Sequence, residues 1–226
     1  MALELWDPIA VTCMKNSGLV DNETYPAEST IKFEFPARGN DLPPCHFFWY
    51  DGGQRNNLPP DEIIAKMGEL GNDTVKKIVD AMNAQKAGAK KKTSGSLLVG
   101  TKGMLFSPDD YGARYFLLPE SDFSDYKPPT QSLPRIPFKG GGDQRQKWEF
   151  VSTIKGDHKP GTMSNFGYAG RLTETILVGN LALRAEIGQR IEWDADNLRS
   201  TNVESVNKFV DREYREGWEV KMPAAV

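Results

Sequence analysis

The stretch Ile31-Lys32-Phe33-Glu34-Phe35-Pro36 points to the fold class, because apolar and polar residues alternate along it. A period of two is typical of a β-strand with one buried and one solvated face. Upstream, residues 9–14 alternate in the same way, with Ile9, Val11 and Cys13 on one side, which predicts a second strand. Downstream, the run 45–50 is apolar on nearly both faces and ends at Asp51-Gly52-Gly53. We therefore expect a central strand closed by a turn.

The middle of the chain predicts short helices, a hairpin and two irregular segments. Asp61 is expected to cap a short helix, and Asp73 a second helix that runs through Met82. Residues 86–92 are small and basic, so we expect a mobile, solvated insertion near 83–93; a nucleic-acid or lipid patch is the alternative. A hairpin with a four-residue loop, Gly100-Thr101-Lys102-Gly103, follows. A Pro-rich strap is expected near 119–137.

The last third of the chain is expected to be mainly helical. Asp143 is expected to cap a helix with an apolar stripe of Trp148, Val151 and Ile154. Residues 168–184 carry so few charges that they predict a mostly buried helix. A short strand at 190–193 and a final amphipathic helix follow, the latter marked by Val203, Val206, Val210 and Tyr214. Strands followed by helices indicate an α+β fold.

Composition favours a small-molecule or protein partner. The chain has 226 residues and a formal net charge of −3, which argues against a protein that tracks nucleic-acid phosphates. No apolar stretch is long enough to cross a bilayer, so no membrane partner is expected. The two cysteines, Cys13 and Cys45, lie in strand-like runs and are expected to be small apolar side chains rather than a disulfide.

A search for catalytic patterns yields none that we can assign. His46 and His158 share no metal-ligand spacing with each other or with cysteine, so no metal site is expected. The dinucleotide pattern Gly-x-Gly-x-x-Gly is missing, including at Gly140-Gly141-Gly142, so we expect the chain to bind no cofactor alone. No Gly-x-Ser-x-Gly nucleophile turn occurs either.

One polar and aromatic segment remains, Ser164 to Glu174, at the entrance to the apolar helix. Donors beside an aromatic ring near a helix N-terminus suit a polyhydroxylated ligand, so substrate binding is predicted for Asn165, Tyr168, Arg171 and Glu174. The alternative is simple helix capping by Ser164 or Asn165, with Glu174 paired internally. Arg38 and Arg135 are weaker candidates.

Six short motifs occur in one order along nearly the whole chain and together resemble a known family. They are Phe35-Pro36-Ala37-Arg38-Gly39, Trp49-Tyr50-Asp51-Gly52-Gly53, Leu117-Leu118-Pro119-Glu120, residues 164–180 (SNFGYAGRLTETILVGN), Glu192-Trp193-Asp194 and Tyr214-Arg215-Glu216-Gly217-Trp218. In this order they resemble the C-terminal region of bacterial oxidoreductases of the glucose-fructose oxidoreductase and inositol dehydrogenase (Gfo/Idh/MocA) family.

The resemblance implies one C-terminal domain over residues 1–226, with an open, mostly antiparallel sheet and helices on one face. Such a domain encloses a sugar-like substrate and forms homo-oligomers through its sheet face, while a Rossmann domain holds NAD or NADP. The family's Glu-Lys-Pro motif has no counterpart here, because Lys127-Pro128 and Lys159-Pro160 follow Tyr126 and His158. No catalytic residue is therefore assigned, and the chain alone is expected to be inactive. We expect a reading frame for a Rossmann domain upstream of Met1. A stand-alone carbohydrate-binding or assembly module without redox activity is the alternative.

Overall fold

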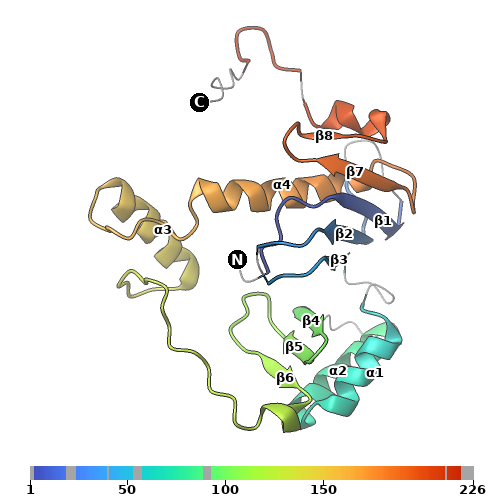
Figure 1. The fold of residues 1–226 in the computed structure, drawn as a ribbon, viewed down its shortest axis with the longest axis vertical. Helices are drawn as coiled ribbons and strands as arrows, with labels where there is room; N and C mark the ends of the chain where they lie inside the picture. Colours follow the sequence, from blue (N-terminus) through green and yellow to red (C-terminus); the bar gives the residue numbers. More distant parts are fainter. Residues whose placement is uncertain are drawn as a thin grey trace. The chain divides into compact units, whose positions relative to one another are not determined.

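The computed structural model describes residues 3–18, 24–39, 41–52, 58–88, 93–211 and 213–219. The chain forms two compact units (Figure 1). Unit 1 is Met1–Leu58 with Leu172–Val226, and unit 2 is Pro59–Arg171. Both combine helices with antiparallel strands, so the fold is α+β. The two units are described separately below.

Unit 1 is built on a five-stranded antiparallel sheet in the order β3-β2-β1-β7-β8. The first three strands are β1 (Ala10–Asn16), β2 (Ser29–Phe35) and β3 (Cys45–Asp51). The chain returns for β7 (Arg190–Asp194) and β8 (Arg199–Ser200). The strands predicted at residues 9–14, 31–36 and 190–193 are therefore confirmed, but the solvated face expected for the first is wrong, because Ala10 and Thr12 are buried and Ile9 is exposed.

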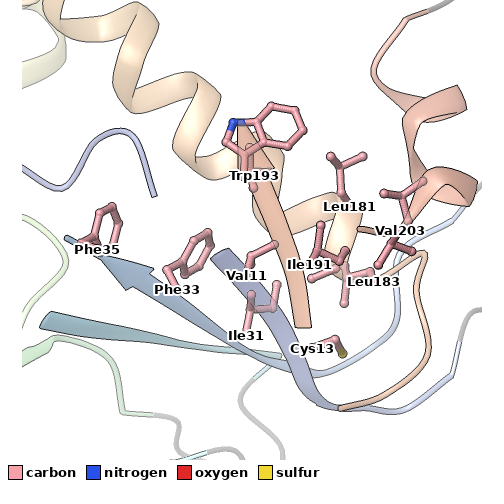
Figure 2. Close-up of a cluster of buried hydrophobic side chains, with 13 residues drawn as sticks. Val11, Cys13, Ile31, Phe33, Phe35, Leu181, Leu183, Ile191, Trp193 and Val203 are labelled. Atoms are coloured by element: carbon pink, nitrogen blue, oxygen red, sulfur yellow. The ribbon is translucent and has the colours of Figure 1, made fainter. Parts of the chain in front are cut away.

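One face of this sheet packs against helix α4 (Phe166–Ala182) and the short 3₁₀ helix η2 (Glu204–Phe209). Phe33 stacks on Phe47 with 5.5 Å between ring centroids, and Gly179 of α4 lies directly over the Phe33 ring. Figure 2 shows the side chains of Val11, Ile31 and Ile191 gathered with Leu181 of α4. Burying each large apolar side chain stabilises the fold by about 1.5–3 kcal/mol. The period of two in β2 is thus the cause of this packing.

Three expectations for unit 1 are wrong in detail. Strand β3 is an edge strand of the sheet rather than a central one, and Phe48 and Trp49 are 40% and 50% exposed. Helix α4 is not mostly buried, because a helix lying on a sheet buries one stripe and leaves Ile176 and Leu177 exposed. The expected final amphipathic helix is the short helix η2, and Tyr214 lies beyond its end.

Unit 2 begins with two helices, α1 (Asp61–Leu70) and α2 (Asp73–Lys86). Both were predicted, but their N-caps are Pro60 and Asn72, one residue before the expected Asp61 and Asp73. Asn72 Oδ1 accepts hydrogen bonds from the amides of Thr74 and Val75. Helix α2 also continues past Met82 to Lys86, so part of the expected insertion is helical, and residues 89–92 lie outside the described residues.

The hairpin of unit 2 is confirmed. It consists of β4 (Ser96–Gly100) and β5 (Gly103–Ser107), and β6 (Phe116–Leu118) adds a third antiparallel strand. Gly100 pairs with Gly103, so two residues rather than four form the loop. Gly103 has a φ of +150°, and a Cβ there would lie 2.4 Å from the Leu118 carbonyl oxygen. Glycine is required at this close approach.

The end of unit 2 contains a 3₁₀ helix η1 (Glu120–Phe123), an irregular segment and helix α3 (Gly142–Ile154). The Pro-rich strap expected near 119–137 is irregular after Phe123, whereas its first residues form η1. The expected cap Asp143 is replaced by Gly141, without a capping side chain. The predicted apolar stripe of α3 is wrong, since Trp148, Val151 and Ile154 are all exposed. Glu149 and Ser152 are buried instead, because the following loop hydrogen-bonds to them.

The two cysteines are free thiols in the described structure. Cys13 is fully buried in the core of unit 1, and Cys45 is half-buried on β3. The expectation that they serve as small apolar side chains is confirmed for Cys13.

Candidate functional site

The predicted ligand loop leads into helix α4, and its first polar residue caps that helix. Asn165 Oδ1 accepts a hydrogen bond from the Tyr168 amide at 3.2 Å, and its Nδ2 donates to the Thr162 carbonyl at 3.4 Å. The Asn165 carbonyl accepts from the amides of Tyr168 and Ala169. This is the geometry of an N-cap residue, which satisfies donors that a helix start leaves unpaired. The capping role weighed for Asn165 is thus confirmed.

The loop before α4 is held by side chains of α3. Glu149 is 8% exposed, and its Oε1 accepts from the Met163 amide at 2.5 Å. Gln146 Nε2 donates to the Ser164 hydroxyl at 3.2 Å. A buried carboxylate that accepts a backbone hydrogen bond fixes the loop strongly. The start of α4 is therefore pre-organised.

The other three candidates occupy different surroundings along α4. Tyr168 is half-buried and Arg171 exposed, and both belong to unit 2, one helical turn apart. Glu174 belongs to unit 1, where its Oε1 accepts a hydrogen bond from Trp193 Nε1 at 2.9 Å. This bond supplies the internal partner expected for Glu174 in the capping alternative. Ligand binding by the four residues remains a prediction.

Of the two weaker candidates, Arg38 makes contacts that stabilise the fold. It is buried, its Nε donates to the Leu3 carbonyl at 2.9 Å, and its guanidinium lies over the Phe35 ring. Arg38 also donates from Nη1 to the Pro36 carbonyl. These contacts tie the N-terminal segment to the end of β2. Arg135 is exposed in the irregular segment after η1.

Sequence reasoning did not single out a charged network on the sheet of unit 1. We call the side of the sheet opposite the core cluster the polar face. It carries Thr12, Thr30, Lys32, Glu34, His46, Phe48, Tyr50, Arg190 and Glu192. The signal that could have found part of it is the alternation within residues 31–36, which sets Lys32 and Glu34 on one side.

An ion-pair chain crosses the middle of the polar face. Arg190 on β7 bonds Glu34 on β2 at 3.2 Å and Glu192 at 2.8 Å, and Lys32 lies 3.2 Å from Glu34. Strand β1 lies between β2 and β7, so the Arg190 side chain reaches across it. The β1 residue paired with both carboxylates is Ala10, which is small and fully buried.

The network changes the protonation of its central carboxylate. The hydrogen bond from Arg190 lowers the pKa of Glu34 below its ordinary value; partial burial opposes this, and Lys32 adds to the lowering. In turn, the hydrogen bond to Glu34 raises the pKa of Arg190. Each charge favours the ionised form of its neighbour. The Glu34–Arg190 pair is therefore stabilised in its ionised form.

An aromatic row lies beside these charges on the edge strand β3. Phe48 stacks on Tyr50 with 6.4 Å between ring centroids, and His46 meets the edge of Phe48 at 6.4 Å. His46 is also the cross-strand partner of Glu34. The polar face thus places a strip of aromatic residues, a class enriched in protein interfaces, next to paired charges.

The described residues contain no Rossmann-type strand–helix–strand unit for a nicotinamide dinucleotide, and cofactor binding by this chain stays a prediction. Such a cofactor binds where parallel strands and a helix meet at a glycine-rich turn, whereas every strand pair described here is antiparallel. Among the same residues, no group of three or more His, Cys, Asp or Glu side chains could hold a metal ion. None of the described helices is both long and apolar enough to span a membrane.

Comparisons with known proteins do not assign the chain to a family. No family model matches the sequence, and a search of curated proteins finds no significant relative. The Gfo/Idh/MocA resemblance therefore rests on the six motifs quoted above.

Proposed function

We propose that this chain is the substrate-binding and oligomerisation domain of an NAD(P)-dependent oxidoreductase that acts on a sugar, polyol or glycoside. In this proposal the nicotinamide cofactor and the proton-transfer residues belong to a Rossmann domain outside these 226 residues. The chain alone is inactive. Its homo-oligomer forms through the polar face of unit 1.

Two observations support the class of protein. The six motifs occur in the family's order across the chain, and the longest of them, residues 164–180, coincides with α4 and its capping loop. The antiparallel sheet of unit 1, with α4 and η2 on one face, agrees with the architecture that the resemblance implies.

The composition of the polar face is the single observation that carries the oligomer part of the proposal. A two-fold interface brings the same patch of two subunits together, so that patch must complement itself. The polar face has two cations, Lys32 and Arg190, and two anions, Glu34 and Glu192. Phe48 adds a side chain that is 40% exposed. A second copy can therefore bury aromatic surface without burying an excess of one charge.

Light scattering of the purified chain, coupled to size-exclusion chromatography, tests this part directly. We expect the wild-type mass to be a multiple of the 25.2 kDa chain mass. Phe48→Lys places a further cation in the patch, opposite its cross-strand partner Lys32, so it should shift the mass toward the monomer. Tyr111→Lys is the matched control, because Tyr111 is 87% exposed and lies in unit 2. A wild-type monomer at high concentration, or equal masses for both variants, would contradict the proposal.

The substrate part has a separate test. Ligand-detected NMR with a panel of sugars and polyols should show saturable binding, reduced by Arg171→Ala. Arg184→Ala is the matched control, because Arg184 follows the end of α4 and its guanidinium lies over the Phe209 ring. If no sugar or polyol gives a response, the proposed substrate binding is refuted. The proposed oligomer is then still tested by its own experiment.

A further inference from the structure

Unit 2 contains a small pocket that the proposed function does not use. It lies where β6 runs into η1 and has a volume of about 180 Å³. Its lining comprises Tyr115, Phe116, Leu117, Leu118, Glu120, Phe123 and Tyr126. Drug-sized ligands occupy pockets of about 300–1,000 Å³. The pocket therefore suits a single small chemical group.

Backbone geometry holds the aromatic walls in place. The Phe123 ring lies against Gly103, where an added Cβ would be 3.3 Å from the ring. The Tyr126 amide donates to the Phe123 carbonyl at 3.0 Å, which closes a turn between the two rings. On the other side, Phe116 stacks on Phe106 of β5 with 6.4 Å between centroids. Contacts with the three-stranded sheet therefore hold the aromatic side chains of the pocket in place.

The polar groups of the pocket are acidic or phenolic. Glu120 Oε1 accepts a hydrogen bond from Asn72 Nδ2 at 3.2 Å, which fixes the carboxylate at the rim. Tyr115 is adjacent to Tyr126, and local desolvation followed by the effect of Tyr126 raises the pKa of the Tyr115 phenol. The Tyr115 phenol is therefore held more firmly in its neutral form.

The charges around the pocket favour a cation. Residues 120–127 contain three carboxylates, Glu120, Asp122 and Asp125, against one cation, Lys127, so the segment is acidic. The faces of aromatic rings also attract cations, because their quadrupole is negative above the ring plane. Aromatic walls and a fixed carboxylate act in the same direction.

We propose that this pocket binds a small organic cation of the quaternary ammonium class, with Phe123 and Tyr126 contacting the methyl groups and Glu120 supplying the counter-charge. A methylated ammonium group is weakly hydrated and fits an aromatic site better than a primary ammonium does. The site is independent of the proposed oxidoreductase role, because its residues lie outside both the α4 loop and the polar face.

The experiment compares choline with its neutral isostere, in which carbon replaces the nitrogen, by saturation-transfer NMR and titration against the full chain. The two ligands share shape and apolar area, so their difference isolates the charge. We expect choline to bind saturably. The isostere lacks the cation–π attraction to the rings, so it should bind about fivefold more weakly or worse. Raising the salt concentration should narrow the difference.

Variants separate the contributions of the ring and the carboxylate. Tyr126→Leu removes a ring face and should weaken choline binding about threefold or more, whereas Tyr126→Phe keeps the face and should change it less than about twofold. Glu120→Gln keeps the acceptor for Asn72 and removes the charge, so it should also weaken choline. Asp80→Asn is the charge-matched control, on the exposed side of α2 and about 12 Å along that helix from Asn72.

Equal binding of choline and the isostere would overturn the proposal, since the pocket would then respond to apolar area. If choline shows no binding, the proposal is overturned as well. Binding of a monosaccharide that Tyr126→Leu weakens and Arg171→Ala leaves unchanged, with no response to choline, would assign the pocket to hydroxyl recognition instead.

Discussion

The close approach of Gly179 in α4 to the sheet allows a direct test of the fold of unit 1. A Cβ added at Gly179 would lie 2.6 Å from Cζ of Phe33, and Phe33 is 4% exposed. Its ring is stacked on Phe47, so it cannot move aside without disturbing another ring. Gly179→Ala should therefore cost about 1–3 kcal/mol through overpacking, offset by about 1 kcal/mol of helix propensity.

Gly170→Ala in the same helix isolates the contact, because a Cβ there meets nothing within 4 Å. It gains helix propensity without a clash and should stabilise the protein by up to about 1 kcal/mol. Urea unfolding followed by circular dichroism should thus place Gly179→Ala about 1–3 kcal/mol below Gly170→Ala. Adding Phe33→Leu to Gly179→Ala should recover part of the loss. Equal stabilities of the two alanine variants would refute the packing argument.

Three further predictions concern polar contacts. Glu174→Leu leaves the Trp193 Nε1–H without its acceptor and should lower the free energy of unfolding by about 1–3 kcal/mol. Glu174→Gln keeps an acceptor and should cost less. Equal losses of the two variants in urea unfolding would contradict this hydrogen bond. Asn165→Ala removes the cap of α4 and should lower the free energy of unfolding by about 1 kcal/mol, whereas Asn165→Asp should retain it. Thermal unfolding followed by circular dichroism measures this difference. An unchanged unfolding midpoint in Asn165→Ala would contradict a stabilising role of the cap. Because the folded pKa of Glu34 lies below its unfolded value, its stabilisation is present above the unfolded pKa and is lost as pH falls through the folded pKa. Arg190→Ala should therefore cost about 0.2–1 kcal/mol at neutral pH and progressively less in acid; a pH-independent difference would count against the network.

The strands of unit 1 could be predicted because their signal is local. Alternation within residues 31–36 identified the buried residues Ile31, Phe33 and Phe35, which all lie in the core cluster. The place of a strand in the sheet is not local, however. The run 45–50 contains so many apolar residues that it suggested a central strand, but β7 pairs with β1 on the far side and leaves β3 at the edge.

The helices show the same division between local and distant causes. Helices α1 and α2 were predicted from the capping residues Asp61 and Asp73, but their N-caps lie one residue earlier, at Pro60 and Asn72, because helix boundaries are the least sharply encoded part of a helix. The apolar stripe of α3 failed for a tertiary reason. Buried Glu149 accepts a hydrogen bond from Met163, fourteen residues later, and so turns the polar side of the helix inward.

In the candidate site, contacts between residues close in sequence could be predicted, and contacts between distant residues could not. Capping by Asn165 could be weighed from sequence because its partners lie three residues away. The acceptor role of Glu174 toward Trp193, nineteen residues later, depends on how α4 meets β7. The Arg190–Glu34 pair spans 156 residues and follows from the sheet order, which no local pattern encodes.

We propose that this chain is the substrate-binding domain of a larger oxidoreductase, whose Rossmann domain binds the nicotinamide. The measurement that tests it most directly is the DNA sequence upstream of the Met1 codon in the source genome. We predict an in-frame Rossmann domain that carries Gly-x-Gly-x-x-Gly after its first strand and a Glu-Lys-Pro motif further on. A different domain at that place, or an unrelated coding sequence that ends before Met1, would contradict the account.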